Sequence, residues 1–224
     1  MTFGQLFCGA GMQPLRRART ETAKSEREVS ILAATEILLR QSGYDSMTMQ
    51  AVATAAGLAK GTLYLYFTSR ESLVLAVHGR LFDRWIYRFA AHQPEFPDFD
   101  RFCHDFARHY ADDPLFLQLA GFANALLESQ LDGEAYIKSK RGMARRVKRL
   151  AGLVCQQFSI APAAAQKLIW GFLTIACGTA QITARQSVTE AGLPDDVVAF
   201  TSLANFKTVF LNAAIPLGAN IISR

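Results

Sequence analysis

Apolar residues recur at spacings of three and four along most of the chain, and no stretch alternates between apolar and polar residues long enough to indicate a β-strand. This pattern predicts an all-α fold. A first helix is expected at about residues 26–42, with Ile31 and Leu38 on its apolar face and Gly43 at its end. A longer helix is expected at about residues 70–91.

Pro94 and Pro97 interrupt the helical pattern and indicate a domain boundary in or just before this segment. Residues 1–25 lack the pattern and are expected to form a mobile, basic arm. The predicted organisation is the arm at 1–25, an N-terminal domain with a connecting helix at 26–91, and a second helical domain at 92–224. Helices of the second domain are expected at about 99–111, 115–129, 132–158, 162–184 and 195–214, with Pro216 and Gly218 ending the last.

Residues 48–67 have the pattern of two short helices that cross closely. Thr48 suits the start of the first helix, because its hydroxyl can accept a hydrogen bond from a backbone N–H. Gly57 lies between the helices, where a residue without Cβ tolerates a positive φ. Ala53 is small enough for a second helix, at about 60–67, to cross near it. Two short helices, a glycine turn and small residues at the crossing are typical of a helix-turn-helix.

The polar residues of the second short helix suit contact with DNA. Lys60 and Gly61 lie at its N-terminus, where backbone N–H groups favour a phosphate. Thr62 carries a hydroxyl and a methyl group that can contact a base edge. A helical hairpin with core aromatics is the alternative, because Tyr64 and Phe67 are spaced as core residues often are. Phosphate contacts are further expected from Tyr64, Tyr66 and Arg70.

A set of short motifs extends across this region. In chain order they are Gly43-Tyr44, Thr48, Ala55-Ala56-Gly57-Leu58, Lys60-Gly61-Thr62-Leu63-Tyr64, Tyr66-Phe67 and Arg70-Glu71-Ser72-Leu73. With these motifs, residues 27–75 resemble the N-terminal domain of the TetR family of bacterial transcriptional regulators. The remainder is compatible with that family's ligand-binding and dimerisation domain by its helical pattern alone.

The resemblance implies a sequence-specific regulator that binds double-stranded DNA as a homodimer on a palindromic operator, usually as a repressor released by a small molecule. Two positions depart from the family's pattern. Ala59 stands where Ser or Thr is usual, which removes a side-chain cap and a phosphate contact, and Tyr66 stands where His is common. Carried over by position, the DNA contacts are Thr48, Lys60, Gly61, Thr62, Tyr64, Tyr66 and Arg70.

Aromatic residues are frequent in the second domain, where either core packing or a pocket for an apolar effector would explain them. The expected helix at 162–184 is apolar nearly all round, so we expect a partner copy to cover one of its faces. The predicted pocket residues are Phe102, Phe106, Tyr110, Phe122 and Trp170, with His104, His109 and Asn124 as polar handles. The predicted dimer contacts are Phe172, Ile175, Phe206 and Phe210.

Charge and cysteine content add little to this picture. The net charge of +5 and the pI near 9.2 permit a phosphate-binding surface without requiring one. Basic residues crowd 138–149, as on a solvated face or at a site for an acidic ligand or DNA. The four cysteines form no C-x-x-C pair, so neither a zinc site nor a disulfide framework is indicated, and scattered thiols fit a cytoplasmic protein. No apolar run reaches the roughly 18 residues of a membrane span, and no secretory signal is indicated.

Two other classes of function compete with a regulator. An all-helical enzyme would need a catalytic motif, but no H-E-x-x-H, P-loop or G-x-S-x-G pattern occurs, so we expect no catalytic residue, metal or cofactor. A helical adaptor that binds only proteins is the third class. A salt-dependent DNA-binding measurement separates both from a regulator, because phosphate contacts make affinity fall steeply with salt.

Overall fold

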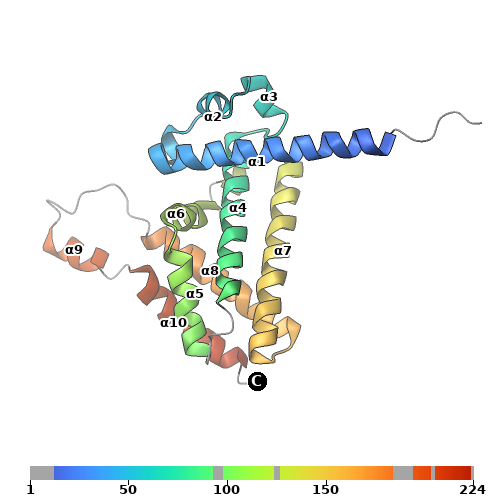
Figure 1. Ribbon diagram of the computed structural model, residues 1–224. Helices are drawn as coiled ribbons and strands as arrows, with labels where there is room; N and C mark the ends of the chain where they lie inside the picture. Colours follow the sequence, from blue (N-terminus) through green and yellow to red (C-terminus); the bar gives the residue numbers. More distant parts are fainter. Residues whose placement is uncertain (1–12, 93–97, 124–126, 184–193, 203–204, 223–224) are drawn as a thin grey trace, which may run out of the picture. The chain divides into compact units, whose positions relative to one another are not determined.

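All regular elements among the described residues are helices, as the spacing of apolar residues predicts (Figure 1). The structure is a computed structural model, and it describes residues 13–92, 98–123, 127–183, 194–202 and 205–222. The chain divides into two compact units, Met1–Thr68 and Ser69–Arg224. This division precedes the predicted helix at 70–91, whereas we expected a boundary after it; the proline segment at 93–97 lies outside the described residues.

The first unit contains α1 (Gln13–Ser46), α2 (Met49–Ala55) and α3 (Lys60–Tyr64). α1 begins well before residue 26, so residues 13–25 are helical where an irregular arm was expected. Three arginines and two alanines there favour a helix, and Pro14 occupies the first turn, where its missing N–H removes no helical hydrogen bond. Residues 1–12 of the expected arm lie outside the described residues.

Four local predictions in the first unit are confirmed. Gly43 interrupts α1 with φ 74° and ψ 177°, as a helix-ending glycine does. Thr48 caps α2, because its Oγ1 accepts a hydrogen bond of 3.1 Å from the backbone N–H of Ala51. Gly57 has a φ of 65° between α2 and α3, and Ala53 is fully buried.

α3 is shorter than the helix predicted at 60–67, but the backbone keeps turning after its end at Tyr64. The N–H groups of Tyr66 and Phe67 both donate to the carbonyl oxygen of Leu63, at 3.0 and 3.1 Å. Leu63 and Phe67 are buried, and α3 packs against α2. The two helices therefore form the helix-turn-helix that the sequence predicts.

The second unit has α5 and α8 at its centre. α5 packs against α4, α6 and α10, and α8 packs against α6, α7 and α10. α4 belongs to this unit because Trp85 and Phe89 on its buried face contact rings of α5. The elements are α4 (Arg70–Ala91), α5 (Phe99–Ala111), α6 (Pro114–Phe122), the 3-10 turn η3 (Glu128–Gln130), α7 (Gly133–Phe158), α8 (Pro162–Thr183), α9 (Asp195–Ser202) and α10 (Phe206–Ile222).

α4, α5, α7 and α8 match the predicted spans closely, and side-chain caps explain where three of them begin. Ser69 and Ser72 exchange hydrogen bonds at the start of α4. Asp98 and Asp132 accept bonds of 2.7 and 2.8 Å from backbone N–H groups at the starts of α5 and α7. Among the described residues, no single helix has the length and apolar composition of a membrane span; α7 and α8 meet that test only as a pair, bent by 118°.

Two predicted helices differ from the structure. The helix predicted at 195–214 is instead α9 followed by α10, because Asn205 starts a new helix by accepting a 3.2 Å bond from the N–H of Thr208. Pro216 lies inside α10 and does not end it. A proline at this position leaves the carbonyl of Asn212, four residues earlier, without its usual helical donor, and Asn212 is an exposed residue. Within the helix predicted at 115–129 the structure has α6 and η3, and residues 124–126 lie outside the described residues.

Candidate functional site

α3 has one buried side and one exposed side. Leu63 is fully buried, whereas Lys60 and Gly61 are exposed and Tyr64 is 43% exposed. Thr62 is half-buried at the edge between them. A Cβ at Gly61 would meet nothing within 4 Å, so packing inside the protein does not require glycine there. The exposed side thus offers an ammonium group, a phenol hydroxyl and open backbone, all of which can contact phosphates.

The caps of α2 and α3 differ in what they leave free. Thr48 is exposed, and because its oxygen accepts the bond from α2, its O–H can still donate to a phosphate. Ala59 is the N-cap of α3 and makes no side-chain bond, which agrees with the loss expected from the sequence. Backbone bonds hold this turn instead, since the N–H groups of Thr62 and Leu63 donate to Ala59 at 3.0 and 3.2 Å.

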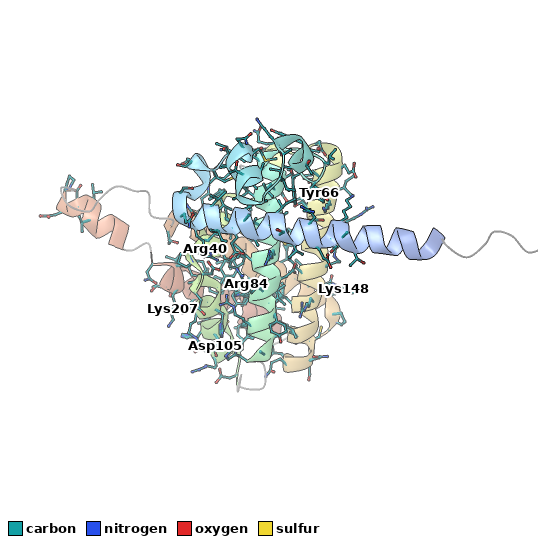
Figure 2. All side chains as sticks on the ribbon, turned by 45° about the horizontal axis from the view of Figure 1, so that its top comes forward. Arg40, Tyr66, Arg84, Asp105, Lys148 and Lys207 are labelled. Atoms are coloured by element: carbon teal, nitrogen blue, oxygen red, sulfur yellow. The ribbon has the colours of Figure 1, made fainter. Side chains whose placement is uncertain are left out.

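The two remaining predicted contacts are less open. Tyr66, labelled in Figure 2, belongs to the first unit. It is half-buried. Arg70 begins α4 in the second unit, where its Nε lies 3.3 Å from Oε1 of Glu71 and its side chain is 33% exposed. The first unit therefore holds every predicted DNA contact except Arg70.

The aromatic residues expected to line a pocket form a packed core in the second unit. Phe102, Phe106 and Tyr110 are buried, and each contacts several other rings. The Phe106 ring is central, with its centroid 5.0 Å from that of Trp85 and 5.3 Å from that of Phe210. These side chains pack edge-to-face and stacked against one another, which stabilises the unit.

The predicted dimer contacts are mostly core residues as well. Phe172, Phe206 and Phe210 are buried within one chain, and the rings of Phe172 and Phe210 lie 5.5 Å apart. Ile175 is half-buried. The three phenylalanines are covered before any partner arrives, so their expected place in an interface is corrected to the core of the second unit.

A different face of α8 is open. Trp170, Thr174, Gly178 and Ile182 follow one another at spacings of four and are all exposed, Trp170 by 59% and Ile182 by 73%. We call these four residues the α8 stripe. Trp170 was expected in an effector pocket; in this chain it is exposed, and its contact with an effector stays a prediction. Phe122, another expected pocket residue, is half-buried at the end of α6.

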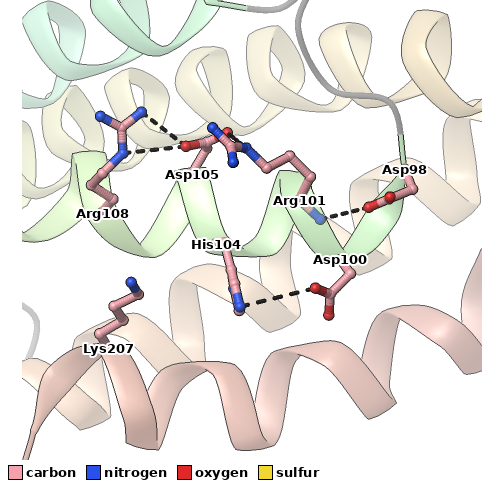
Figure 3. A pocket seen from close by; sticks show the side chains of 7 residues that line it. All are labelled: Asp98, Asp100, Arg101, His104, Asp105, Arg108 and Lys207. Atoms are coloured by element: carbon pink, nitrogen blue, oxygen red, sulfur yellow. Dashed lines mark hydrogen bonds and ion pairs between the residues drawn. The ribbon is translucent and has the colours of Figure 1, made fainter.

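A pocket of about 650 Å³ lies on α5 and α10, and its lining is charged (Figure 3). Asp105 is buried and accepts 2.8 Å hydrogen bonds from Nε of Arg101 and Nη2 of Arg108. Burial alone would raise the pKa of Asp105, but the hydrogen bonds from Arg108 and Arg101 outweigh it and hold that pKa below its usual value. The lining residues are Asp98, Asp100, Arg101, His104, Asp105, Arg108 and Lys207.

The expected polar handles of the second unit are not gathered at one site. His104 lines the charged pocket, with Nε2 at 3.9 Å from Oδ2 of Asp100. His109 is buried, and burial followed by the charge of Arg108 lowers its pKa. Asn124 lies outside the described residues.

Two comparisons with known families together cover most of the chain. Residues 31–77 match the family described as "Bacterial regulatory proteins, tetR family", and residues 79–219 match "Tetracyclin repressor-like, C-terminal domain". The chain belongs to the TetR family. It is a DNA-binding transcriptional regulator, and the resemblance seen in residues 27–75 is confirmed.

TetR-family relatives align with this chain over very different lengths. The transcriptional repressor KstR of Mycolicibacterium smegmatis is 44% identical over 62 residues, which are 28% of this chain and 30% of KstR. The regulator RutR of Escherichia coli is 26% identical over 211 residues, which are 90% of this chain and 95% of RutR. This chain therefore spans under a third of KstR, so activities of the whole KstR protein are not carried over.

Solved structures of the TetR family confirm the fold. The repressor AlkX from a Dietzia strain, described as implicated in biodegradation of n-alkanes, has a TM-score of 0.53 and 19% identity. The alignment covers 85% of this chain and 94% of AlkX. At this identity the likeness supports the two-part helical architecture and nothing about the ligand.

Two basic residues in α7 of this TetR-family chain have a role that the sequence did not indicate. Nζ of Lys140 lies 2.6 Å from Oε2 of Glu128, and Arg146 binds Asp83 on α4. Lys140 and Arg146 therefore hold α7 to η3 and α4. The basic residues of α7 do not all belong to a solvated face. The sequence carried no signal for the second pair, because its members are 63 positions apart.

Proposed function

We propose that this TetR-family chain is a homodimeric repressor, which binds a palindromic operator and leaves it when a small molecule binds the second unit. The observation that carries the DNA-binding part is the two-sided character of α3. Leu63 fixes one side in the protein core, while Lys60, Gly61 and Tyr64 are open on the other. A recognition helix needs a buried side and an open side, because it must be held rigidly while its outer side enters a major groove.

The proposed DNA contacts divide into three roles. Thr62 reads a base edge, since its hydroxyl and methyl can each contact one. Gly61 allows the DNA backbone to approach closely, in keeping with the open space around it. The phosphate contacts are Thr48, Lys60, Tyr64, Tyr66 and Arg70.

The name of KstR and the description of AlkX as repressors support the direction of regulation. We propose that the effector is a largely apolar small molecule, as the frequency of aromatic residues in the second unit suggested, and that the aromatic core between α4, α5, α6 and α8 must rearrange to admit it. We further propose that the protein has no catalytic activity, needs no cofactor and acts in the cytoplasm, where its operator is found.

A homodimer follows from what a palindromic operator requires. Recognition helices of a dimer must reach successive major grooves about 34–36 Å apart, and one chain carries a single helix-turn-helix among its described residues. The α8 stripe supports a second copy as partner, because Trp170 and Ile182 expose large apolar side chains beside Gly178.

Fluorescence anisotropy with DNA from upstream of the gene itself tests the regulator. We expect saturable binding whose affinity falls steeply with salt. Lys60→Ala should weaken binding, whereas Lys148→Ala, which removes an exposed lysine from α7, should leave it unchanged. Equal losses in both variants would point to the basic helix as a DNA contact, and salt-independent or absent binding would contradict the proposed function.

A further inference from the structure

Leu65 is the most exposed large apolar side chain in the described part of the chain, at 79%. It directly follows α3, and its φ of −71° and ψ of −17° continue the helical turn. Its N–H donates a hydrogen bond of 3.2 Å to the carbonyl oxygen of Thr62. Single exposed leucines are common on protein surfaces, so it is the position of Leu65 that matters.

Leu65 lies on the side of α3 that faces away from the protein core. Successive residues of a helix are rotated by about 100°, so Leu65 and Gly61 each lie about 160° from the fully buried Leu63. Thr62 and Tyr64 lie about 100° to either side of Leu63, and both are less exposed than Leu65. Gly61 has no side chain, so Leu65 extends furthest outward from this helix.

This position places Leu65 over the bases when α3 lies in a major groove. The outermost side chains of such a helix are nearest the base edges, and those on its flanks are nearest the phosphates. Lys60 and Tyr64 lie four positions apart on one flank, which agrees with their proposed phosphate contacts. Leu65 then lies beside Thr62, the proposed base contact, three positions earlier in the helix.

The composition of this surface favours an apolar contact with a base. Residues 60–67 contain no Arg, Asn, Gln, Asp or Glu, the side chains that form the most specific hydrogen bonds to guanine, adenine and cytosine. The C5-methyl group of thymine is the apolar group that base pairs present in the major groove. A leucine against a polar base edge would cover donors or acceptors without pairing them, which is unfavourable.

We propose that Leu65 contacts the C5-methyl group of a thymine in each half of the operator and thereby selects for thymine at that position. The inference rests on the proposed function, in which α3 is the recognition helix. It adds an apolar contact to the base edge assigned to Thr62. Any other base pair at this position removes the methyl group from the place that Leu65 covers, so the operator is restricted there to T·A.

Deoxyuridine tests this contact, because it differs from thymidine only by the missing methyl group and keeps every hydrogen bond of the base pair. Protection of DNA from upstream of the gene by the wild-type protein first locates the operator. Each thymine is then replaced by deoxyuridine in turn, and affinity is measured by fluorescence anisotropy. At the position that Leu65 contacts, the replacement should weaken wild-type binding about fourfold in each half-site, the effect of one buried methyl group.

Three variants assign the methyl contact to a residue. Leu65→Ala should bind the thymine operator less tightly and lose the preference for thymine over deoxyuridine at this position, with an unchanged melting temperature because the site is exposed. Thr62→Ser removes the neighbouring methyl group, keeps the hydroxyl and should retain the preference. Ile137→Ala shortens a 50% exposed side chain on α7, and as the matched control it should change neither affinity nor preference.

Two results would overturn the contact and leave the recognition helix in place. One is saturable operator binding that no deoxyuridine replacement weakens. The other is a preference that persists in Leu65→Ala, and its loss in Thr62→Ser would then identify Thr62 as the residue that contacts the methyl group. Absence of saturable DNA binding by the wild-type protein would instead contradict the proposed function, and the thymine contact with it.

Discussion

Arg146 on α7 binds Asp83 on α4 through two hydrogen bonds, Nε to Oδ1 at 2.9 Å and Nη2 to Oδ2 at 2.7 Å. Two glycines make room for the guanidinium. A Cβ at Gly79 would lie 2.8 Å from Nη2 of Arg146, and a Cβ at Gly142 would lie 2.9 Å from its Nη1. The arginine also lies over the Phe82 ring, 5.9 Å from its centroid. It therefore holds the two helices together by charge and by packing.

The first prediction separates these two contributions. Asp83→Ala should destabilise the second unit by only about 0.5–1 kcal/mol, because its carboxylate is 55% exposed and screened by water. Arg146→Ala should cost more, about 1–3 kcal/mol, since it also removes buried stem and the contact with Phe82. Urea unfolding followed by tryptophan fluorescence measures this, since both tryptophans belong to the second unit. Arg149→Ala, an exposed site on the same helix, is the control and should change nothing.

The second prediction concerns the pH dependence of stability. The pKa of His78 is lowered from 6.5 to about 4 in the folded chain, mainly by burial. Between these values the unfolded chain binds a proton that the folded chain does not, so stability falls as pH falls from 6.5 to 4. The full loss is about 3 kcal/mol. His78→Phe should reduce this slope while remaining as stable near pH 7, because it removes a buried nitrogen, Nε2, that has no hydrogen-bond partner among the described residues. Identical slopes in the two proteins would show that His78 does not titrate as described.

The third prediction uses two glycines in different surroundings. A Cβ at Gly218 would lie 1.8 Å from Cζ of Phe99, and that ring is itself packed 5.6 Å from Phe158. Gly218→Ala should therefore destabilise the second unit by about 1–3 kcal/mol. Gly152 is exposed in α7 with nothing within 4 Å, so Gly152→Ala should stabilise by about 0.5–1 kcal/mol. Melting temperatures that shift in the same direction would contradict this account.

The parts of the fold that could be predicted from the sequence are those that depend on neighbouring residues. The cap at Thr48 and the positive φ at Gly57 depend on neighbouring residues alone, and both were predicted. Which face of α8 is buried could not be predicted from the sequence. Phe172 is buried and Trp170 is 59% exposed, although they are two positions apart in a helix that is apolar nearly all round. The few polar residues of this helix, such as Thr174 and Gln181, are exposed, but they are too sparse to have fixed in advance which apolar residues face outward.

The same limit applies to interactions between distant positions. Arg146 appeared as one basic residue among several, since nothing in the chain marks Asp83, 63 positions away, as its partner. Asn205 and Pro216 were misjudged for another reason. Asn205 caps a new helix and Pro216 lies inside it, and residue type alone does not say whether an asparagine caps a helix or a proline ends one. The exposed side of α3 was predictable, because the short motif there determines which residues pack inward and which stay outside.

The fourth prediction distinguishes base reading from phosphate binding on α3. Thr62→Val keeps the shape and the methyl group but removes the hydroxyl, so it should change the preference at one base pair by about 1–3 kcal/mol. Lys60→Ala should weaken all sequences alike and lower the salt slope by about 1. Competition with operators that differ at single base pairs measures both effects. A uniform loss in Thr62→Val would remove that residue from the base-reading set.

The last prediction is that the α8 stripe forms the interface between two copies. Trp170 and Ile182 are the large exposed apolar side chains on this face, and the small Gly178 between them allows a partner helix to approach. A charge at Trp170 would be buried without a partner in such an interface, which strongly opposes association. Trp170→Glu should therefore sediment as a monomer of 24.7 kDa, while the wild-type chain sediments at twice that mass at micromolar concentration.

The matched control is Tyr87→Glu, which changes an aromatic residue that is 69% exposed on α4 and should leave the dimer intact. Trp170→Glu should also lose operator affinity, because two recognition helices no longer bind as one unit. A wild-type monomer, or dissociation by Tyr87→Glu but not by Trp170→Glu, would contradict this interface.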